Sequence, residues 1–195
     1  MKKRCEWVKS EILKAYHDEE YGVRNHDDSY LFEMLVLEFM QAGLSFETIL
    51  KKREAMREAF DGFSYEKIAQ YDEEKIEELL SNENIIRNKL KIKALVKNAR
   101  AFIKTREDFS SFDKYLETFV KEPIDYKRRD GQVICESDLS KKLAKDMKKR
   151  GFSFVGPTII HSFMEAVGLV KKVLLGNFTS PGRWAKKCLP DHGGG

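Results

Sequence analysis

The sequence predicts an all-α fold for this chain of 195 residues. Only four prolines interrupt it, and few stretches alternate Val, Ile or Thr with polar residues as β-strands do. Apolar residues instead recur at helical spacing along most of the chain. We expect a single domain over residues 1–195, with a helical core over about residues 28–170 and an irregular tail over 171–195. The N- and C-terminal segments are expected to form a second small lobe.

Capping residues and apolar periodicity divide the core into separate helices. Asp27 to Ser29 offer N-caps for a helix through about Gln41, which Gly43 ends, and Ser45 caps the next helix. Further helices are expected over residues 65–70, 72–80, 85–102, 111–121, 138–150 and 157–168, the last beginning at a proline. Residues 122–136 are expected to form a loop.

Composition indicates the class of protein. With 42% hydrophobic and 35% charged residues the chain is typical of a soluble globular protein. No apolar run approaches the ~20 residues that span a membrane, and the N-terminus lacks the apolar stretch of a secretory signal. The three cysteines, Cys5, Cys135 and Cys188, are too few and too scattered for a disulfide framework. They favour a reducing cytoplasm.

Charge is distributed unevenly along the chain. The net formal charge is only +4, but residues 87–104 are rich in Lys and Arg without one acidic residue, and residues 141–150 are nearly as basic. A segregated basic face is what a polyanion such as DNA would bind. The alternative is that these lysines are ordinary solvated faces of amphipathic helices.

Glu38 breaks the apolar face of its predicted helix. Leu31, Met34, Leu35 and Ala42 share that face, so the Glu38 carboxylate projects toward the interior. A buried charge needs a partner or a pocket, because leaving it unpaired costs several kcal/mol. Either Glu38 is a functional carboxylate, or it reaches solvent or a basic side chain at the helix end.

Cysteine and histidine residues near the two ends of the chain are compatible with a zinc site. The N-terminal segment gathers Cys5, Trp7, Tyr16, His17 and Tyr21, and Cys and His are residue types that zinc favours. Two ligands do not close a tetrahedral site. Cys188 and His192 have a plausible ligand spacing near the other end, but nothing in the sequence brings the two ends together. A buried thiol and a hydrogen-bonded imidazole are the alternative.

The polar turn at residues 81–84 separates two predicted helices and is followed by Arg87, Asn88 and Lys89. Such a unit directs the free N–H groups of its second helix toward a phosphate, with basic side chains beside them. The turn has asparagines where DNA-repair hairpins usually have glycines. It could equally be a simple connection between helices.

Taken together, the motifs resemble the DNA-3-methyladenine glycosylase I family of the helix-hairpin-helix superfamily. The matching segments are RCEW (4–7), AYHDEEYGV (15–23), LFEMLVLEFMQAGLSFETILKKRE (31–54), NIIRNKLKIKALVKNARAF (84–102) and SDLSKKLAKDMKKRGFSFVGPTIIHSFMEAVGLV (137–170). They run in order, without large gaps, over residues 4–170.

The resemblance implies a monofunctional base-excision repair enzyme. Such an enzyme flips 3-methyladenine, and by extension 3-methylguanine, out of double-stranded DNA and hydrolyses its N-glycosidic bond. The resemblance implies catalytic roles for Glu38 and Tyr16, base binding by Trp7, Tyr21, Phe46 and Ser162, and DNA binding by Leu44, Arg87, Asn88, Lys89 and Lys91. It also implies a cytoplasmic monomer that releases free 3-methyladenine and has no membrane partner. No cofactor is required for the chemistry.

The chain departs from the family pattern at the aromatic residues and at the zinc ligands. Phe46 and Tyr21 stand where tryptophan is frequent. The family's structural zinc takes an N-terminal Cys and His, matched by Cys5 and His17, and a C-terminal pair matched in register by Val173 and Asn177, which cannot ligate zinc. Either the tail supplies Cys188 and His192 instead, or the site is empty; we expect an empty or degraded site.

These departures leave two alternatives to the glycosylase. One is a DNA-lesion-binding module that kept the fold but lost turnover. The other is an alkylbase glycosylase with a shifted substrate range.

Overall fold

The computed structural model of the chain describes residues 4–5, 7–126 and 134–171. Within these ranges the chain is helical as predicted, apart from an isolated parallel bridge between Ile124 and Val170. In chain order the elements are α1 (Glu11–Glu19), α2 (Asp28–Met40), α3 (Phe46–Ala59), the 3-10 turn η1 (Asp61–Phe63), α4 (Tyr65–Ile68), α5 (Glu73–Ser81), α6 (Lys89–Phe109), α7 (Phe112–Glu117), α8 (Asp138–Lys149) and α9 (Pro157–Ala166).

The predicted caps of α2 and α3 are confirmed. The Asp27 carboxylate accepts hydrogen bonds from the N–H groups of Ser29 and Tyr30, at 2.6 and 3.2 Å. The Ser45 hydroxyl accepts one from the N–H of Thr48 at 3.1 Å. Each cap satisfies N–H groups that have no partner within the helix. Local sequence therefore determines where these two helices begin.

Two features of the helices differ from the prediction. Helix α6 begins at Lys89 rather than Ile85, because Asn88 caps it by accepting from the N–H of Lys91 at 3.1 Å. Ile85 is buried from within the turn, so its apolar side chain was wrongly counted as part of the helical pattern. Helix α1 was not predicted, although Leu13, Tyr16 and His17 are buried at helical spacing.

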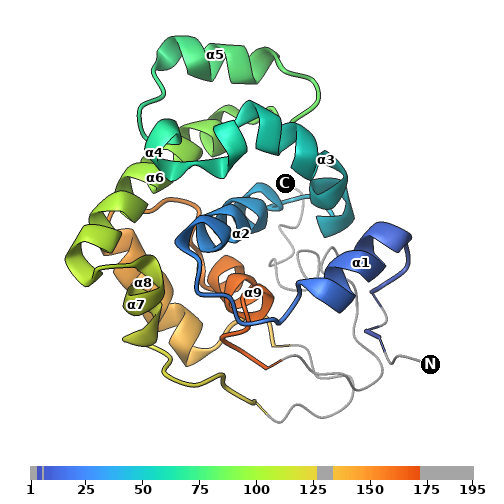
Figure 1. The fold of residues 1–195 in the computed structure, drawn as a ribbon, viewed down its shortest axis with the longest axis vertical. Coiled ribbons are helices and arrows are strands. Elements are labelled where there is room, and N and C mark those ends of the chain that lie inside the picture. The colour runs from blue at the N-terminus through green and yellow to red at the C-terminus, as the bar shows by residue number, and fades with distance from the viewer. Residues whose placement is uncertain (1–3, 6, 127–133, 172–195) are drawn as a thin grey trace, which may run out of the picture.

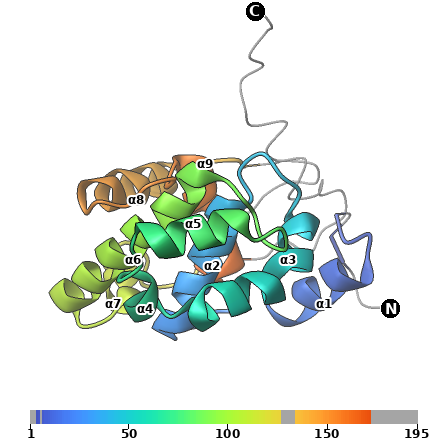
Figure 2. The ribbon, with the colours of Figure 1, turned by 90° about the horizontal axis from the view of Figure 1, so that it is seen from above.

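Helices α2 and α9 lie at the centre of the molecule, and the other helices surround them (Figure 1). Every residue of α2 from Leu31 to Met40 is buried, including two glutamates. Helix α1 lies at the opposite end of the molecule from α7 and α8 (Figure 2). Helices α5 and α6 form a hairpin, and α5 lies at the outer edge of the molecule (Figure 1). A central helix that is buried all round can present polar side chains to an internal pocket.

The N-terminal segment packs against α3 and the end of α9. The N–H of Gly22 donates to the carbonyl of Ala166 at 3.0 Å. Gly168, at φ +73°, passes so close to the chain that a Cβ there would lie 2.6 Å from the backbone nitrogen of Arg24. This is the N-terminal half of the predicted second lobe, and it shares the central hydrophobic core. The C-terminal half falls almost entirely outside the described residues. No helix in the described ranges is long and apolar enough to cross a membrane.

Candidate active site

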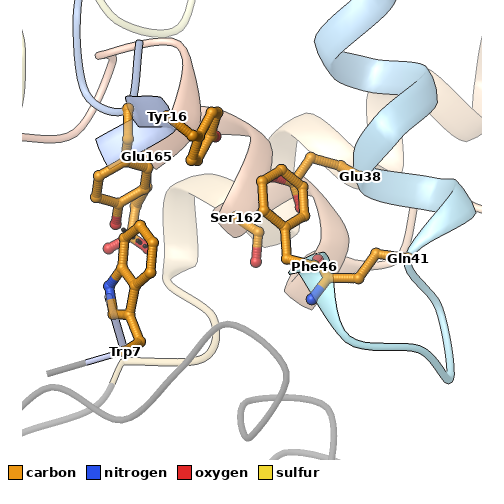
Figure 3. A pocket seen from close by; sticks show the side chains of 8 residues that line it. Trp7, Tyr16, Glu38, Gln41, Phe46, Ser162 and Glu165 are labelled. Atoms are coloured by element: carbon orange, nitrogen blue, oxygen red, sulfur yellow. Dashed lines mark hydrogen bonds between the residues drawn. The ribbon is translucent and has the colours of Figure 1, made fainter. Parts of the chain in front are cut away.

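A pocket opens where α1, α2, α9, the first turn of α3 and the N-terminal segment meet (Figure 3). Its empty volume, including the open mouth, is about 340 Å³. It is lined by Trp7, Tyr16, Tyr21, Glu38, Gln41, Phe46, Ser162 and Glu165. The structure therefore brings together all six residues that the sequence assigned to catalysis or base binding, from segments up to 155 positions apart (162 − 7).

Aromatic rings form the walls of the pocket. The ring centroids of Tyr16 and Phe46 are 4.9 Å apart, and those of Trp7 and Tyr21 are 5.4 Å apart with the rings nearly perpendicular. Trp7 and Tyr16 are 6.5 Å apart. Aromatic faces are electron-rich and attract cations, so these walls are suited to a flat, positively charged ring.

The Tyr16 hydroxyl is directed into this enclosure without an internal partner. It is buried and has no hydrogen bond to any group of the described residues. Burial, followed by the charge of Glu38, raises the pKa of Tyr16 well above its ordinary value, so the hydroxyl keeps its proton. Buried polar groups are normally satisfied, so this hydroxyl is available to a ligand as donor or acceptor.

Glu38 and Glu33 are two buried carboxylates on α2 in opposite electrostatic situations. Glu33 accepts from Arg53 at 2.7 Å and from Arg57 at 2.6 Å. Glu38 forms no ion pair within the described residues, and burial together with the negative charge of Glu165 raises its pKa to about 8. Glu38 therefore reaches neither solvent nor a basic side chain of the described residues at the helix end. Near neutral pH its carboxyl group keeps a proton, and a cation bound in the pocket would favour the ionised form.

The raised pKa predicts how stability depends on pH. Between pH 4.5 and about 8 the folded protein holds a proton on Glu38 that the unfolded chain has lost, so Glu38 destabilises the fold as pH rises through this window. The loss approaches a limit on the order of 5 kcal/mol. We expect Glu38→Gln to melt at a higher temperature than the wild type at pH 9 and at the same temperature at pH 4.5. Equal melting temperatures at both pH values would contradict the buried, uncompensated carboxylate.

Gln41 and Glu165 line the pocket but were not predicted. Each stands three positions after a predicted residue, Gln41 after Glu38 on α2 and Glu165 after Ser162 on α9. Residues three apart share one face of a helix. The same spacing argument, applied once more along each helix, would have found both.

The hairpin residues and the loop after α2 have the exposure that a DNA-facing surface needs. The side chains of Arg87 and Lys89 are 48% and 62% exposed. The Asn88 side chain caps α6 through its carbonyl oxygen. Leu44 is half-buried beside the pocket, in the tight loop that Gly43 makes possible at φ +80°. This geometry is compatible with the predicted DNA contacts of these residues, which stay predictions.

The predicted DNA contact of Lys91 is wrong. Lys91 is buried, and its ammonium donates to the carbonyls of Met40 at 2.8 Å and Ala42 at 2.6 Å. These carbonyls lie at the C-terminal end of α2, where no intrahelical donor reaches them and a positive charge is favourable. Lys91 therefore joins the hairpin to the pocket instead of reaching a phosphate.

The two N-terminal candidates for zinc ligation, Cys5 and His17, lie close together. The N–H of Cys5 points to His17 Nε2 at 3.4 Å, and His17 Nδ1 lies 2.9 Å from Asp18, which also binds Arg4. A carboxylate on Nδ1 leaves Nε2 as the acceptor, the form in which imidazole ligates metals. Two residues do not complete a tetrahedral site. Cys188 and His192, like Val173 and Asn177, lie outside the described residues, so the expected empty or degraded zinc site stays a prediction.

One cysteine differs from the expectation that the cysteines of this chain are reduced. Cys5 is buried. Cys135, at the start of the last described range, is disulfide-bonded.

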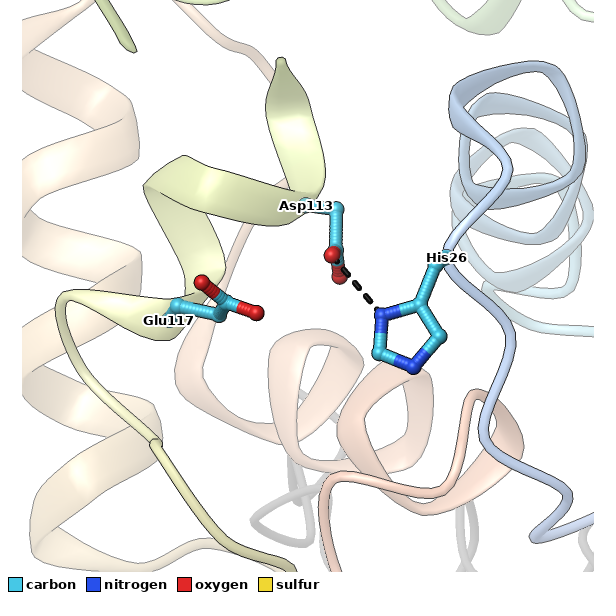
Figure 4. A group of neighbouring side chains, drawn as sticks. All are labelled: His26, Asp113 and Glu117. Atoms are coloured by element: carbon cyan, nitrogen blue, oxygen red, sulfur yellow. Dashed lines mark hydrogen bonds and ion pairs between the residues drawn. The ribbon is translucent and has the colours of Figure 1, made fainter. Parts of the chain in front are cut away.

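His26, Asp113 and Glu117 form a separate acidic group near α7 (Figure 4). Asp113 accepts from His26 Nδ1 at 2.8 Å and is also paired with Arg24. Glu117 is paired with Lys114 at 2.8 Å. Basic side chains already neutralise both carboxylates, so this group fastens the segment before α2 to α7 and carries no argument for a metal ion.

Comparison with known proteins decides the family. The profile of a family described as methyladenine glycosylase matches residues 7–179. The chain belongs to the methyladenine glycosylase family. The predicted helix-hairpin-helix glycosylase fold is confirmed, and with it the assignment to hydrolases that act on N-glycosyl bonds.

Individual relatives agree with this methyladenine glycosylase assignment. DNA-3-methyladenine glycosylase 1 of Escherichia coli (strain K12) is 41% identical over 182 residues, which cover 92% of this chain and 97% of the relative. A crystal structure of 3-methyladenine DNA glycosylase I is 44% identical, with a TM-score of 0.81 over 86% of this chain and 93% of the other. The Staphylococcus aureus enzyme, whose structure concerns 3-methyladenine recognition, is 38% identical, with a TM-score of 0.80 over 83% and 87% of the two chains.

Proposed function

We propose that this methyladenine glycosylase excises 3-methyladenine from alkylated double-stranded DNA in base-excision repair, as a monofunctional enzyme. The observation that carries the proposal is the pocket, in which the buried carboxyl group of Glu38 and the buried hydroxyl of Tyr16 stand among aromatic rings, neither of them paired with another of the described residues. A pure DNA-binding module would gain nothing from a buried acidic group. A catalytic site for a cationic base gains both selectivity and orientation from it.

The chemistry needs little from the protein once the base is held. Alkylation at N3 makes the base a cation, so the bond between C1′ and N9 breaks with its electron pair moving onto the base. The base leaves as neutral 3-methyladenine, a water adds to C1′, and one proton passes to solvent, which leaves an abasic site. Glu38 holds the base edge and offsets positive charge, Tyr16 hydrogen-bonds the base, and the ring of Phe46 stacks on it.

The DNA is held outside the pocket. Leu44, in the loop beside the pocket, is suited to fill the space that the extruded nucleotide leaves. Arg87, Lys89 and the free N–H groups at the start of α6 are suited to the phosphates on one side of the lesion. Because Lys91 donates to the carbonyls at the end of α2, it fixes the position of the hairpin relative to this loop.

The decisive experiment is incubation of the protein with methylated duplex DNA, followed by chromatography of the released bases. We expect 3-methyladenine, with little 7-methylguanine. Release of no base by a folded protein that binds the DNA would support the lesion-binding alternative. A different spectrum of bases would show a shifted substrate range.

Replacement of the exposed Lys89 tests the hairpin. Lys89→Ala is expected to weaken DNA binding and to reduce the slope of log K against log salt by about one unit, because one phosphate contact releases about one counterion. The measurement is DNA binding by fluorescence anisotropy at several salt concentrations. Lys114→Ala on α7, remote from the hairpin, is the matched control and should leave the slope unchanged. An unchanged slope for Lys89→Ala would remove that residue from the interface.

No step of this chemistry passes through a metal. Zinc, if the tail of the chain supplies the missing ligands, would hold Cys5 and His17 together and stabilise the N-terminal segment that carries Trp7. Metal analysis of the purified protein distinguishes the two cases. We place the enzyme in the cytoplasm, acting on DNA as a monomer.

A further inference from the structure

Glu165 is a second carboxylate in the pocket, and the mechanism above does not use it. It lies on α9, one turn after Ser162, and its side chain lines the pocket while being only 5% exposed. Figure 3 shows it beside Trp7, facing the same space that Glu38 reaches from α2. Two acidic side chains that line one largely apolar enclosure repel each other when both are ionised, and a cation placed between them reduces this repulsion.

Two polar side chains, His161 and Tyr21, contact the carboxylate of Glu165. Its Oε1 lies 3.8 Å from Nε2 of His161, and its Oε2 accepts from the hydroxyl of Tyr21 at 3.5 Å. His161 is completely buried, and its Nδ1 lies 3.3 Å from the hydroxyl of Ser137 at the N-terminus of α8. Such contacts stabilise a buried carboxylate and hold it in one orientation.

We infer that Glu165 is a specificity-determining residue which, held by His161 and Tyr21, makes the pocket select cationic alkylated bases over neutral ones. The inference rests on the proposed function and identifies what the pocket recognises, namely the positive charge of the base. The effect of Glu165 on Glu38, whose pKa it raises, shows that its charge is felt across the pocket. A cation between the two carboxylates would relieve their repulsion, whereas a neutral purine would not.

The same charge distinguishes reactant from product. The alkylated base enters as a cation and leaves neutral, because the electron pair of the broken C1′–N9 bond stays on it. A pocket with two carboxylates attracts the base before cleavage and no longer does so afterwards. Glu165 therefore favours the bound lesion over both undamaged adenine and the released product.

The test compares two ligands of nearly the same shape and different charge. 3,9-Dimethyladeninium carries a fixed positive charge because both alkylated nitrogens are blocked, and free 3-methyladenine is neutral at pH 8. Binding of each to the wild type and to Glu165→Gln is measured by calorimetry. The variant keeps the size and hydrogen-bonding shape of the side chain and removes its charge.

We expect Glu165→Gln to lose about tenfold or more in affinity for the cationic ligand and less than about threefold for the neutral one. Ser162→Ala, one turn away on α9, is the matched control, because it removes a polar contact without a change of charge and should weaken both ligands alike. His161→Gln should shift the ratio of the two affinities in the same direction as Glu165→Gln, by a smaller factor.

Equal losses for both ligands, or no loss for either, would overturn the inference and leave Glu165 as a packing residue. An unchanged ratio in a folded His161→Gln would remove His161 from its positioning role. The failure of the proposed function is separable, because ligand binding needs no turnover. If the wild type releases no base from methylated DNA, the glycosylase function is refuted. If release is normal but Glu165→Gln loses affinity equally for both ligands, only the role of Glu165 is refuted.

Discussion

Glu38→Gln is expected to lower the rate of 3-methyladenine release by about 10- to 100-fold. The carboxylate has no ion pair within the described structure, and the cationic base is the partner that its burial requires. Glutamine retains the shape and a neutral hydrogen bond but loses the charge, and a hydrogen bond to a charged group contributes about 1.5–3 kcal/mol. The measurement is kcat/KM for base release from methylated duplex DNA.

Glu33→Gln is the matched control for this experiment. Glu33 is also buried on α2, but its charge is already paired with Arg53 and Arg57. Its replacement should lower stability and leave base release per folded molecule nearly unchanged. Affinity for undamaged DNA should be unaffected in Glu38→Gln, because Glu38 faces the pocket. Full activity of Glu38→Gln would show that the pocket is wrongly assigned.

Lys91→Met is expected to destabilise the fold by about 2–4 kcal/mol, which corresponds to a fall of about 4 to 16 °C in the melting temperature. The substitution keeps an apolar stem of similar length and removes the ammonium, so the carbonyls of Met40 and Ala42 lose their donor. The loop that carries Leu44 begins at these carbonyls. Base release should therefore fall as well, because the loop and the hairpin lose their common support.

The salt dependence of DNA binding distinguishes the role of Lys91 from that of Lys89 on the same helix. Lys91→Met should leave the slope of log K against log salt unchanged, whereas Lys89→Ala should reduce it by about one unit. Thermal melting with circular dichroism gives the stability, and anisotropy titrations give the slope. If Lys91→Met were as stable as the wild type and reduced the slope, Lys91 would contact a phosphate after all, contrary to what its burial indicates.

Much of the fold follows from short-range features of the sequence. The caps at Asp27 and Ser45 were predicted because one side chain and the N–H groups two to three residues ahead of it complete the interaction. The start of α6 was not, because Ile85 is apolar at a helical interval yet is buried from a turn. An apolar residue reveals that it will be buried and does not reveal which backbone conformation buries it.

The candidate site shows the same division. Glu38 stood out because a charge on an apolar helix face violates a local pattern, and family resemblance supplied the other pocket residues and Leu44. Gln41 and Glu165 were within reach of the same spacing rule.

From the amino-acid sequence alone one can predict the helical class, the main caps, the family and six of the eight residues that line the pocket. The contact of Lys91 with the carbonyls at the end of α2, and the place of Glu165 in the same pocket as Glu38, become visible only in the folded chain. The physical reason is that the charge state and partners of a buried ionisable group depend on groups distant in the chain. Lys91 forms hydrogen bonds to carbonyls 49 and 51 positions away, and no local sequence pattern predicts such contacts.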